Sequence, residues 1–284
     1  MAFLRASIPP AHPSAQILGE ERTGASVAVS PEHLLTAHYL VLGASRAELV
    51  GLDGRVRPAD RIAIDLDSGL ALLTVEGAAF DPAHIVEDEE LQLGDPVFML
   101  TCTSEKDRRG ASGHVSFAGP FEAFWEYMLD RAIMTTIVNP GLAGGPLLNR
   151  NGHVAGIVSL GLASVGRYSL AIPMRLFLEQ RARMERGDPV PEGDRHAWVG
   201  FYPQASDGGI AISGVVPSGP ADSAGLQRGD LLVSVDGRAV QSLRQLYRML
   251  WRKSPGAIVG MQVLREESIH VIEVVAGDAY EFFK

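Results

Sequence analysis

Short apolar runs alternate with turn residues from residue 23 to about residue 173 of the chain. The runs lie at residues 26–29, 47–51, 70–75, 96–100, 113–116, 154–159 and 169–172. This rhythm is typical of an all-β sandwich or barrel, because strands that alternate with helices are spaced further apart. A helix is predicted next, at residues 174–185, with arginines toward its end, where cations interact favourably with the helix dipole.

A polar stretch rich in proline and glycine, residues 187–194, separates this first block from a second one. The second block contains an amphipathic helix at residues 242–252, for which Ser242 is a suitable N-cap. A shorter helix closed by glycine is predicted at residues 219–226. We therefore expect an N-terminal extension (residues 1–19), a β domain (20–186), a linker (187–196), a second domain (197–278) and a C-terminal tail (279–284).

The composition is that of a globular protein with room for two domains. The chain has 284 residues, of which 46% are hydrophobic and 21% are charged. The chain has no run of about 18 apolar residues, which is the length needed to span a bilayer, so we expect no membrane insertion. Pro9, Pro10 and Pro13 interrupt the start, where a signal peptide needs a continuous apolar core, and a cytoplasmic location is therefore favoured. Cys102 is the single cysteine, which excludes an internal disulfide.

Charge and histidine spacing argue against two kinds of ligand. The net charge of −9 argues against nucleic acid as a partner, because phosphate contacts need clustered Lys and Arg. The eight histidines are scattered, and none pairs with another at the spacing of metal ligands. We expect neither a metal site nor another cofactor.

Residues 139–148 form the most informative motif, N-P-G-L-A-G-G-P-L-L. It resembles the nucleophile loop N-P-G-N-S-G-G-P-L of the HtrA/Deg branch of the chymotrypsin-like serine proteases. The resemblance places Ala143 where that family has its nucleophilic serine. The alternative interpretation is a pair of tight turns at Asn-Pro-Gly and Gly-Gly-Pro.

Two further motifs resemble the surroundings of the family's catalytic histidine and aspartate. Residues 34–41, L-L-T-A-H-Y-L-V, are similar to L-T-x-x-H-V-V, which places Tyr39 at the histidine position. Residues 65–73, D-L-D-S-G-L-A-L-L, are similar to D-x-x-x-D-L-A-L-L, which places Gly69 at the aspartate position. The neighbouring His38 is either an ordinary, partly buried histidine or reaches the cleft through a local shift of the loop.

The resemblance covers about residues 20–175 and implies a chymotrypsin-like double β-barrel. Covalent hydrolysis of a peptide bond needs a nucleophile, a base and an orienting acid. Since all three positions are substituted, we expect a pseudoprotease that is not an enzyme. The backbone N–H groups of Gly141 and Ala143 occupy the positions of the family's oxyanion hole. They either hold a carbonyl or carboxylate group or persist because the turn stabilises the barrel.

Residues 197–277 resemble a PDZ domain of the HtrA type. The family's Y-L-G-I carboxylate-binding loop appears as Trp198, Val199, Gly200 and Phe201, and residues 215–232 match the family motif V-x-P-x-S-P-A-x-x-A-G-L-x-x-G-D-x-I. The resemblance implies that a peptide C-terminus pairs with the strand after Phe201, lies against helix 242–252 and places its carboxylate on the loop. The helix residues expected to shape side-chain pockets are Leu243, Leu246, Tyr247 and Leu250. A PDZ fold retained only as a spacer is the alternative.

These motifs lead to three functional hypotheses. The first is a pseudoprotease that binds protein C-termini or unfolded polypeptide as a scaffold, regulator or chaperone-like protein. The second is an active HtrA-like serine endopeptidase in protein quality control. The third is a subunit that regulates an active relative, because the resembled family forms trimers. A homo-trimer or a hetero-oligomer with an active relative is then expected, with Phe3 and Leu4 as candidate contacts.

Overall fold

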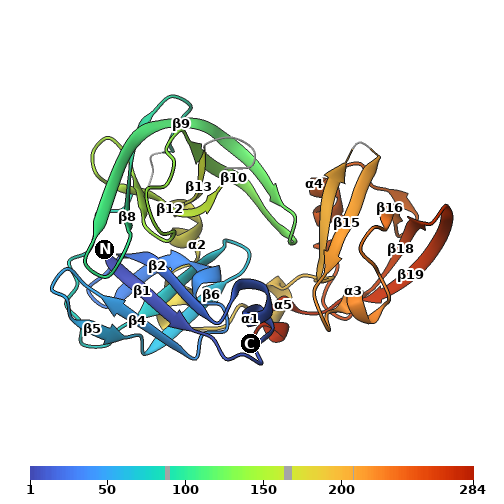
Figure 1. Ribbon diagram of the computed structural model, residues 1–284, viewed down its shortest axis with the longest axis horizontal. Helices are drawn as coiled ribbons and strands as arrows, with labels where there is room; N and C mark the ends of the chain where they lie inside the picture. The colour runs from blue at the N-terminus through green and yellow to red at the C-terminus, as the bar shows by residue number, and fades with distance from the viewer. Residues whose placement is uncertain (87–89, 163–167, 207) are drawn as a thin grey trace. The chain divides into compact units, whose positions relative to one another are not determined.

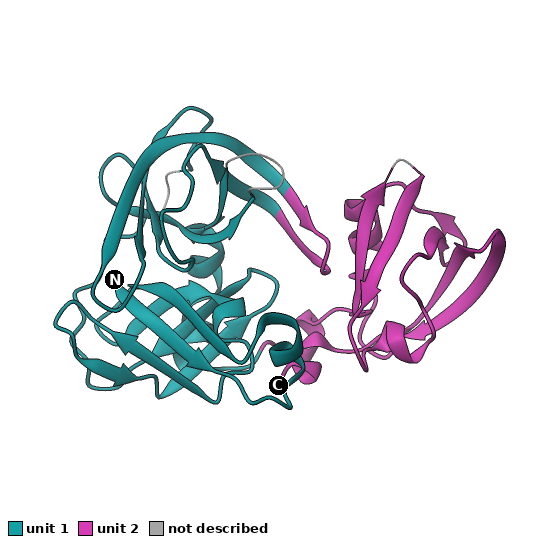
Figure 2. Ribbon diagram, viewed as in Figure 1, with its two compact units in different colours: residues 1–120, 130–189 teal, residues 121–129, 190–284 magenta. Residues whose placement is uncertain are grey.

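The computed structural model describes residues 1–86, 90–162, 168–206 and 208–284. The chain divides into two compact units (Figure 2). The first consists of Met1–Pro120 and Asp130–Pro189, and the second of Phe121–Leu129 and Val190–Lys284. The boundaries expected from the sequence did not anticipate that Phe121–Leu129 would group with the C-terminal residues.

The first unit begins with a seven-stranded sheet of strand order β5-β4-β1-β2-β3-β7-β6 (Figure 1). Its strands are β1 (Ala2–Ser7), β2 (Glu21–Ala28), β3 (His33–Ala37), β4 (Arg46–Val50), β5 (Val56–Pro58), β6 (Arg61–Asp65) and β7 (Leu70–Thr74). One face is buried on a core that includes Leu4, Leu34, Leu49 and Leu73. Alternating apolar side chains place these residues on the same face of the sheet.

A closed barrel of strand order β10-β13-β12-β11-β8-β9 forms the second part of this unit. Its strands are β8 (Pro96–Cys102), β9 (Arg108–Ala123), β10 (Tyr127–Thr135), β11 (Pro146–Leu148), β12 (Val154–Gly161) and β13 (Ser169–Pro173). Val97, Met99, Leu147 and Val158 fill the interior. Closure leaves the strands of the barrel without a free edge.

The described residues of the first unit also form the helical segments α1 (Pro13–Leu18), η1 (His38–Leu40) and α2 (Met174–Arg186). Helix α2 buries Phe177 and Met184 and ends at Gly187, whose φ of +73° glycine adopts without strain. Near its end Arg183 forms an ion pair with Asp65, and both side chains are nearly buried. This ion pair joins α2 to the end of β6.

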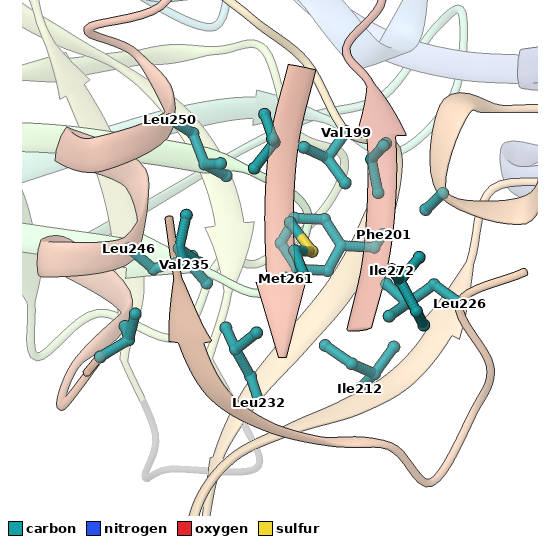
Figure 3. Close-up of a cluster of buried hydrophobic side chains, with 14 of the residues drawn as sticks. Val199, Phe201, Ile212, Leu226, Leu232, Val235, Leu246, Leu250, Met261 and Ile272 are labelled. Atoms are coloured by element: carbon teal, nitrogen blue, oxygen red, sulfur yellow. The ribbon is translucent and has the colours of Figure 1, made fainter. Parts of the chain in front are cut away.

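The second unit is a sheet of order β14-β15-β16-β18-β19, with β17 paired to β16. Its elements are η2 (Glu192–Asp194), β14 (Phe201–Ser206), β15 (Gly209–Val215), α3 (Pro220–Ser223), β16 (Leu231–Val235), β17 (Arg238–Ala239), α4 (Leu243–Leu250), β18 (Ile258–Arg265), β19 (Ser268–Val275) and α5 (Ala279–Phe282). Figure 3 shows Leu246 and Leu250 of α4 directed toward Met261 in the core of the sheet.

Most of the elements predicted from the sequence are confirmed. Each of the seven apolar runs overlaps a strand, and the helices expected at 174–185, 219–226 and 242–252 correspond to α2, α3 and α4. Ser242 is the N-cap of α4 and accepts a hydrogen bond from the Gln245 N–H at 3.2 Å. Asp236 and Gly237 both have positive φ in the tight turn between β16 and β17.

The two ends of the chain differ from expectation. Residues 1–19 were predicted as an extension, but β1 pairs with both β2 and β4, and Leu4 is fully buried. Residues 279–284 were predicted as a tail, but Phe282 packs on Trp198 with ring centroids 4.7 Å apart. Within the described residues, no helix combines the length and apolar character needed to cross a membrane.

The Asp65–Arg183 ion pair gives a prediction about stability. Replacement of Arg183 by Met leaves the Asp65 carboxylate buried without its cation, which costs about 3 kcal/mol of unfolding free energy. The matched change Arg175→Met removes an exposed helix pair with Glu179 and costs less than about 1 kcal/mol. Urea unfolding at neutral pH measures both. Equal losses in the two variants would contradict a structural role for the buried pair.

Candidate functional site

The loop before β11 carries the motif that resembles a nucleophile loop. The carbonyl oxygen of Ala143 accepts a hydrogen bond from the Ala25 N–H of β2 at 2.7 Å, and the Gly144 N–H donates to the carbonyl oxygen of Val158 in β12 at 2.8 Å. Gly144 has a φ of +91°, and a Cβ atom there would lie 2.0 Å from the carbonyl oxygen of Ala25. Close packing of the loop against β2 therefore requires glycine at position 144.

The fold brings the other two predicted triad positions close to this loop. Tyr39 lies in η1, and its hydroxyl donates to the carbonyl oxygen of Ser159 at 2.9 Å. Ser159 is the neighbour of Val158, which binds Gly144. On the other side of Tyr39, the His38 N–H donates to the carbonyl oxygen of Gly69 at 2.9 Å. Tyr39, Gly69 and the Ala143 loop thus occupy one region of the first unit.

The side chains of this region supply little charge at neutral pH. Burial raises the pKa of Tyr39 to about 12, so its phenol stays protonated. Burial also lowers the pKa of His38, so its imidazole is neutral. The Gly141 N–H, one of the two predicted oxyanion-hole donors, donates to Asn139 Oδ1 at 3.1 Å within its own loop. Asp65, the first residue of the 65–73 motif, forms an ion pair with Arg183.

The predicted carboxylate-binding loop of the second unit holds a carboxylate. Glu126 Oε2 accepts from the Val199 N–H at 3.0 Å, while Glu126 Oε1 accepts from the N–H groups of Gly200 at 2.6 Å and Phe201 at 3.2 Å. Gly200 has a φ of +78°, which turns its N–H toward the same point as its neighbours. The loop therefore has the donor geometry of an anion site.

Glu126 titrates far from its ordinary range. Burial raises its pKa to about 7, although the three amide hydrogen bonds lower it. Only 8% of the residue is exposed. Burial also raises the pKa of Tyr247, whose hydroxyl is hydrogen-bonded to the Glu126 backbone. Near neutral pH the Glu126 carboxyl is thus divided between its charged and neutral forms.

The predicted peptide-binding residues fall into two groups. The backbone N–H groups of Val199, Gly200 and Phe201 converge, as described. The side chains of Leu246, Tyr247 and Leu250 are fully buried members of the core cluster, whereas Leu243 is only partly buried against it. Trp198 is packed by Phe282 and Phe283. Whether the helix residues shape ligand pockets stays a prediction.

Reasoning from the sequence missed Glu126. Its partners in the loop are 73 to 75 positions away in the sequence, so no local spacing reveals them. One signal was available, because residues 121–127, which follow the predicted strand at 113–116, read F-E-A-F-W-E-Y, where polar turn residues are usual. Aromatic side chains at such a turn indicate that another surface covers it.

No three His, Cys, Asp or Glu side chains among the described residues are grouped so that they could hold a metal ion.

Comparison with family models divides the chain in the same order. Residues 23–157 match the trypsin-like peptidase domain, and residues 197–275 match the PDZ domain. The curated relatives include probable periplasmic serine endoproteases described as DegP-like. That of Halomonas elongata is 29% identical over 95% of this chain and 60% of its own length. That of Ectopseudomonas mendocina is 28% identical over 97% of this chain and 61% of its own length.

The chain thus spans about three fifths of the length of these relatives. Among solved structures, the serine endoprotease from Yersinia pestis matches with 20% identity and a TM-score of 0.57, covering 98% of this chain and 93% of that one. The HtrA-type protease AlgW with a tripeptide matches with 23% identity and a TM-score of 0.58, with the same coverage. These two likenesses show the fold.

The names of the relatives contradict two of our predictions. We expected a chain that is not an enzyme, but the relatives are named serine endoproteases, which favours the endopeptidase alternative over the pseudoprotease. Three substituted positions in a motif alignment do not measure activity, and this is why the inference went too far. We also favoured a cytoplasmic location, whereas the relatives are named periplasmic. The oligomeric state stays a prediction.

The fold expected from the sequence is confirmed: a mostly β, trypsin-like double-barrel domain precedes a PDZ domain. The two domain matches follow each other along the chain in the order expected from the sequence. The chain therefore carries the trypsin-like peptidase domain and the PDZ domain that its resemblance to HtrA proteases implies.

Proposed function

We propose that this chain binds the C-termini of proteins through its PDZ domain, within an HtrA-type serine endoprotease. The observation that carries the proposal is the convergence of three backbone N–H groups, those of Val199, Gly200 and Phe201, on a single carboxylate. A peptide C-terminus presents the same chemical group as the Glu126 side chain. The loop is therefore suited to the terminal carboxylate of an extended peptide.

The elements around the loop support this assignment. β14 follows Phe201 and is the edge strand of its sheet, so its outer edge is the side on which an added strand can pair. Among the four helix residues that we predicted to shape pockets, Leu243 on α4 is partly buried, whereas the other three are fully buried. A strand placed between β14 and α4 would complete the sheet and bring its C-terminus to the loop.

Binding should depend on the free carboxylate of the peptide. We expect a fluorescent peptide with a free C-terminus to bind at least about tenfold more tightly than its amidated form, because buried N–H groups left without an acceptor are costly. Gly200→Ala should weaken binding, since φ at Gly200 is positive. The matched change Gly225→Ala, also at positive φ in this domain, should not. Equal binding of both peptides in a polarisation assay would contradict the proposal.

Hydrolysis of peptide bonds by the first domain is the second candidate function, and it is favoured by the names of the relatives. Under this proposal the nucleophile is a hydroxyl other than residue 143, because Ala143 has none. Ser159, Thr135 and Thr136 are three of the hydroxyl residues close to the Ala143 loop in the sequence. The Tyr39 hydroxyl binds the carbonyl oxygen of Ser159, which places residue 159 beside it.

An activity assay with a covalent probe tests this second function. We expect the purified chain to produce new N-termini from an unfolded substrate and to react with a fluorophosphonate at one hydroxyl, which mass spectrometry identifies. Ala143→Ser should change neither the rate nor the labelled residue, because Tyr39 and Gly69 provide no imidazole or carboxylate to activate a serine there. The absence of both cleavage and labelling would refute hydrolysis by this chain.

A further inference from the structure

The segment Phe121–Leu129 covers the carboxylate-binding loop. It belongs to the second unit and forms the turn between β9 and β10 (Figure 2). Glu126 at its tip binds the three loop N–H groups. The loop donors that a peptide C-terminus needs are therefore already engaged by a side chain of the same polypeptide.

Helix α4 holds the same segment at three points. The Tyr247 hydroxyl donates to the carbonyl oxygen of Ala123 at 2.5 Å, and the Glu126 N–H donates to the Tyr247 oxygen at 3.2 Å. Arg244 Nε forms an ion pair with Glu122 at 2.5 Å. Arg244 and Tyr247 are three positions apart on α4 and therefore neighbours on the surface of the helix. The segment thus contacts the helix as well as the loop.

Apolar contacts complete the docking. Met128 packs against the core cluster of the second unit. The Phe124 ring approaches that of Tyr202 on β14, with centroids 6.5 Å apart. The segment therefore touches the loop, the edge strand and the helix, which are the three elements that a C-terminal peptide would contact.

We propose that Phe121–Leu129 is an intramolecular ligand of the PDZ domain, and that a protein C-terminus binds only after displacing Glu126 from the loop. This inference rests on the proposed function of the same loop. The segment supplies a carboxylate to the N–H groups, a backbone carbonyl to Tyr247 and an acidic side chain to Arg244. A displacing peptide that reproduces these groups has a free C-terminus and an acidic residue a few positions before it.

The segment Phe121–Leu129 competes with a free peptide for the loop as a ligand held at high effective concentration. A segment tethered within the chain competes at millimolar effective concentrations without the entropy loss of association. The apparent affinity for a free peptide equals the affinity of the open loop multiplied by the fraction of molecules whose loop is open. Removal of the Glu126 carboxylate raises that fraction and leaves the loop itself unchanged.

A binding experiment with Glu126→Ala tests the proposal. The probe is a fluorescein-labelled Glu-Ala-Phe-Trp-Val peptide with a free C-terminus, whose first four residues copy Glu122–Trp125. We expect it to bind the variant at least about tenfold more tightly than the wild-type chain. Glu273→Gln, which removes an exposed carboxylate from β19, is the matched control and should bind like the wild type.

Hydrogen exchange without any peptide gives a second, independent readout. In Glu126→Ala the amides of Val199, Gly200 and Phe201 should exchange faster than in the wild type, whereas Glu273→Gln should leave them protected. Glu122→Gln, which loosens the segment without touching the loop, should give an intermediate effect.

The outcomes separate the two proposals. Equal probe affinity in wild type and Glu126→Ala would overturn the intramolecular ligand and leave the binding of C-termini standing. Faster exchange with no probe binding in any variant would refute the binding of C-termini, and the displacement proposal with it. Tighter binding together with faster exchange supports both.

The pKa of Glu126 reports whether the segment Phe121–Leu129 is docked on the carboxylate-binding loop. Burial in the loop raises its pKa to about 7 from an ordinary 4.5, so docking is fully favoured below the ordinary value and is weakened as the pH rises through 7. His196, Tyr247, Glu122 and Arg244 are the other titratable or charged groups around it.

We expect the Gly200 amide NMR signal of the wild type to titrate with a midpoint near 7. Glu126→Gln removes this titration and leaves any contribution from His196. A wild-type midpoint for the Glu126 carboxyl carbon near its ordinary 4.5 would show that the segment is undocked and would overturn the proposal.

Discussion

Three hydrogen bonds from consecutive backbone amides to one carboxylate organise the functional part of the second unit. Buried N–H groups need acceptors, and the turn at Gly200 aims the N–H groups of Val199, Gly200 and Phe201 at the same point. Glu126 satisfies all three, but burial of its charge opposes the gain. The two effects nearly balance at neutral pH, which leaves the contact close to the point where a competing carboxylate can replace it.

The first unit is held together by backbone contacts in the region where the HtrA proteases that it resembles have catalytic side chains. The loop around Ala143 is fixed to β2 and β12 through Ala25 and Val158, and Gly144 is required by the close approach to β2. These interactions use only the main chain, so they persist whatever side chain stands at position 143. The geometry of the loop is consequently no guide to its reactivity, and the relatives' names carry the evidence for hydrolysis.

The sequence predicted the β architecture well because its signals are local. The apolar run of residues 70–75 and the N-cap at Ser242 each depend on a few neighbouring residues. β1 was missed because its apolar run is followed at once by prolines, and its pairing with β2 and β4 is not encoded nearby. The Glu126 contact was missed for the same reason, because its partners lie more than 70 positions away in the sequence. The resemblance to the PDZ motif identified the carboxylate-binding loop but not the Glu126 carboxylate that is bound to it.

The backbone of Glu126 has a φ of +55°, in the left-handed region that residues with a Cβ atom adopt at a cost of about 1 kcal/mol. Glycine would remove this strain and also the charge that is buried in the loop. The N–H groups of Val199, Gly200 and Phe201 would then lose their acceptor, which costs more than the strain that glycine removes. Glu126 is in this sense a residue at which local backbone strain is compensated by hydrogen bonds to a loop distant in the sequence.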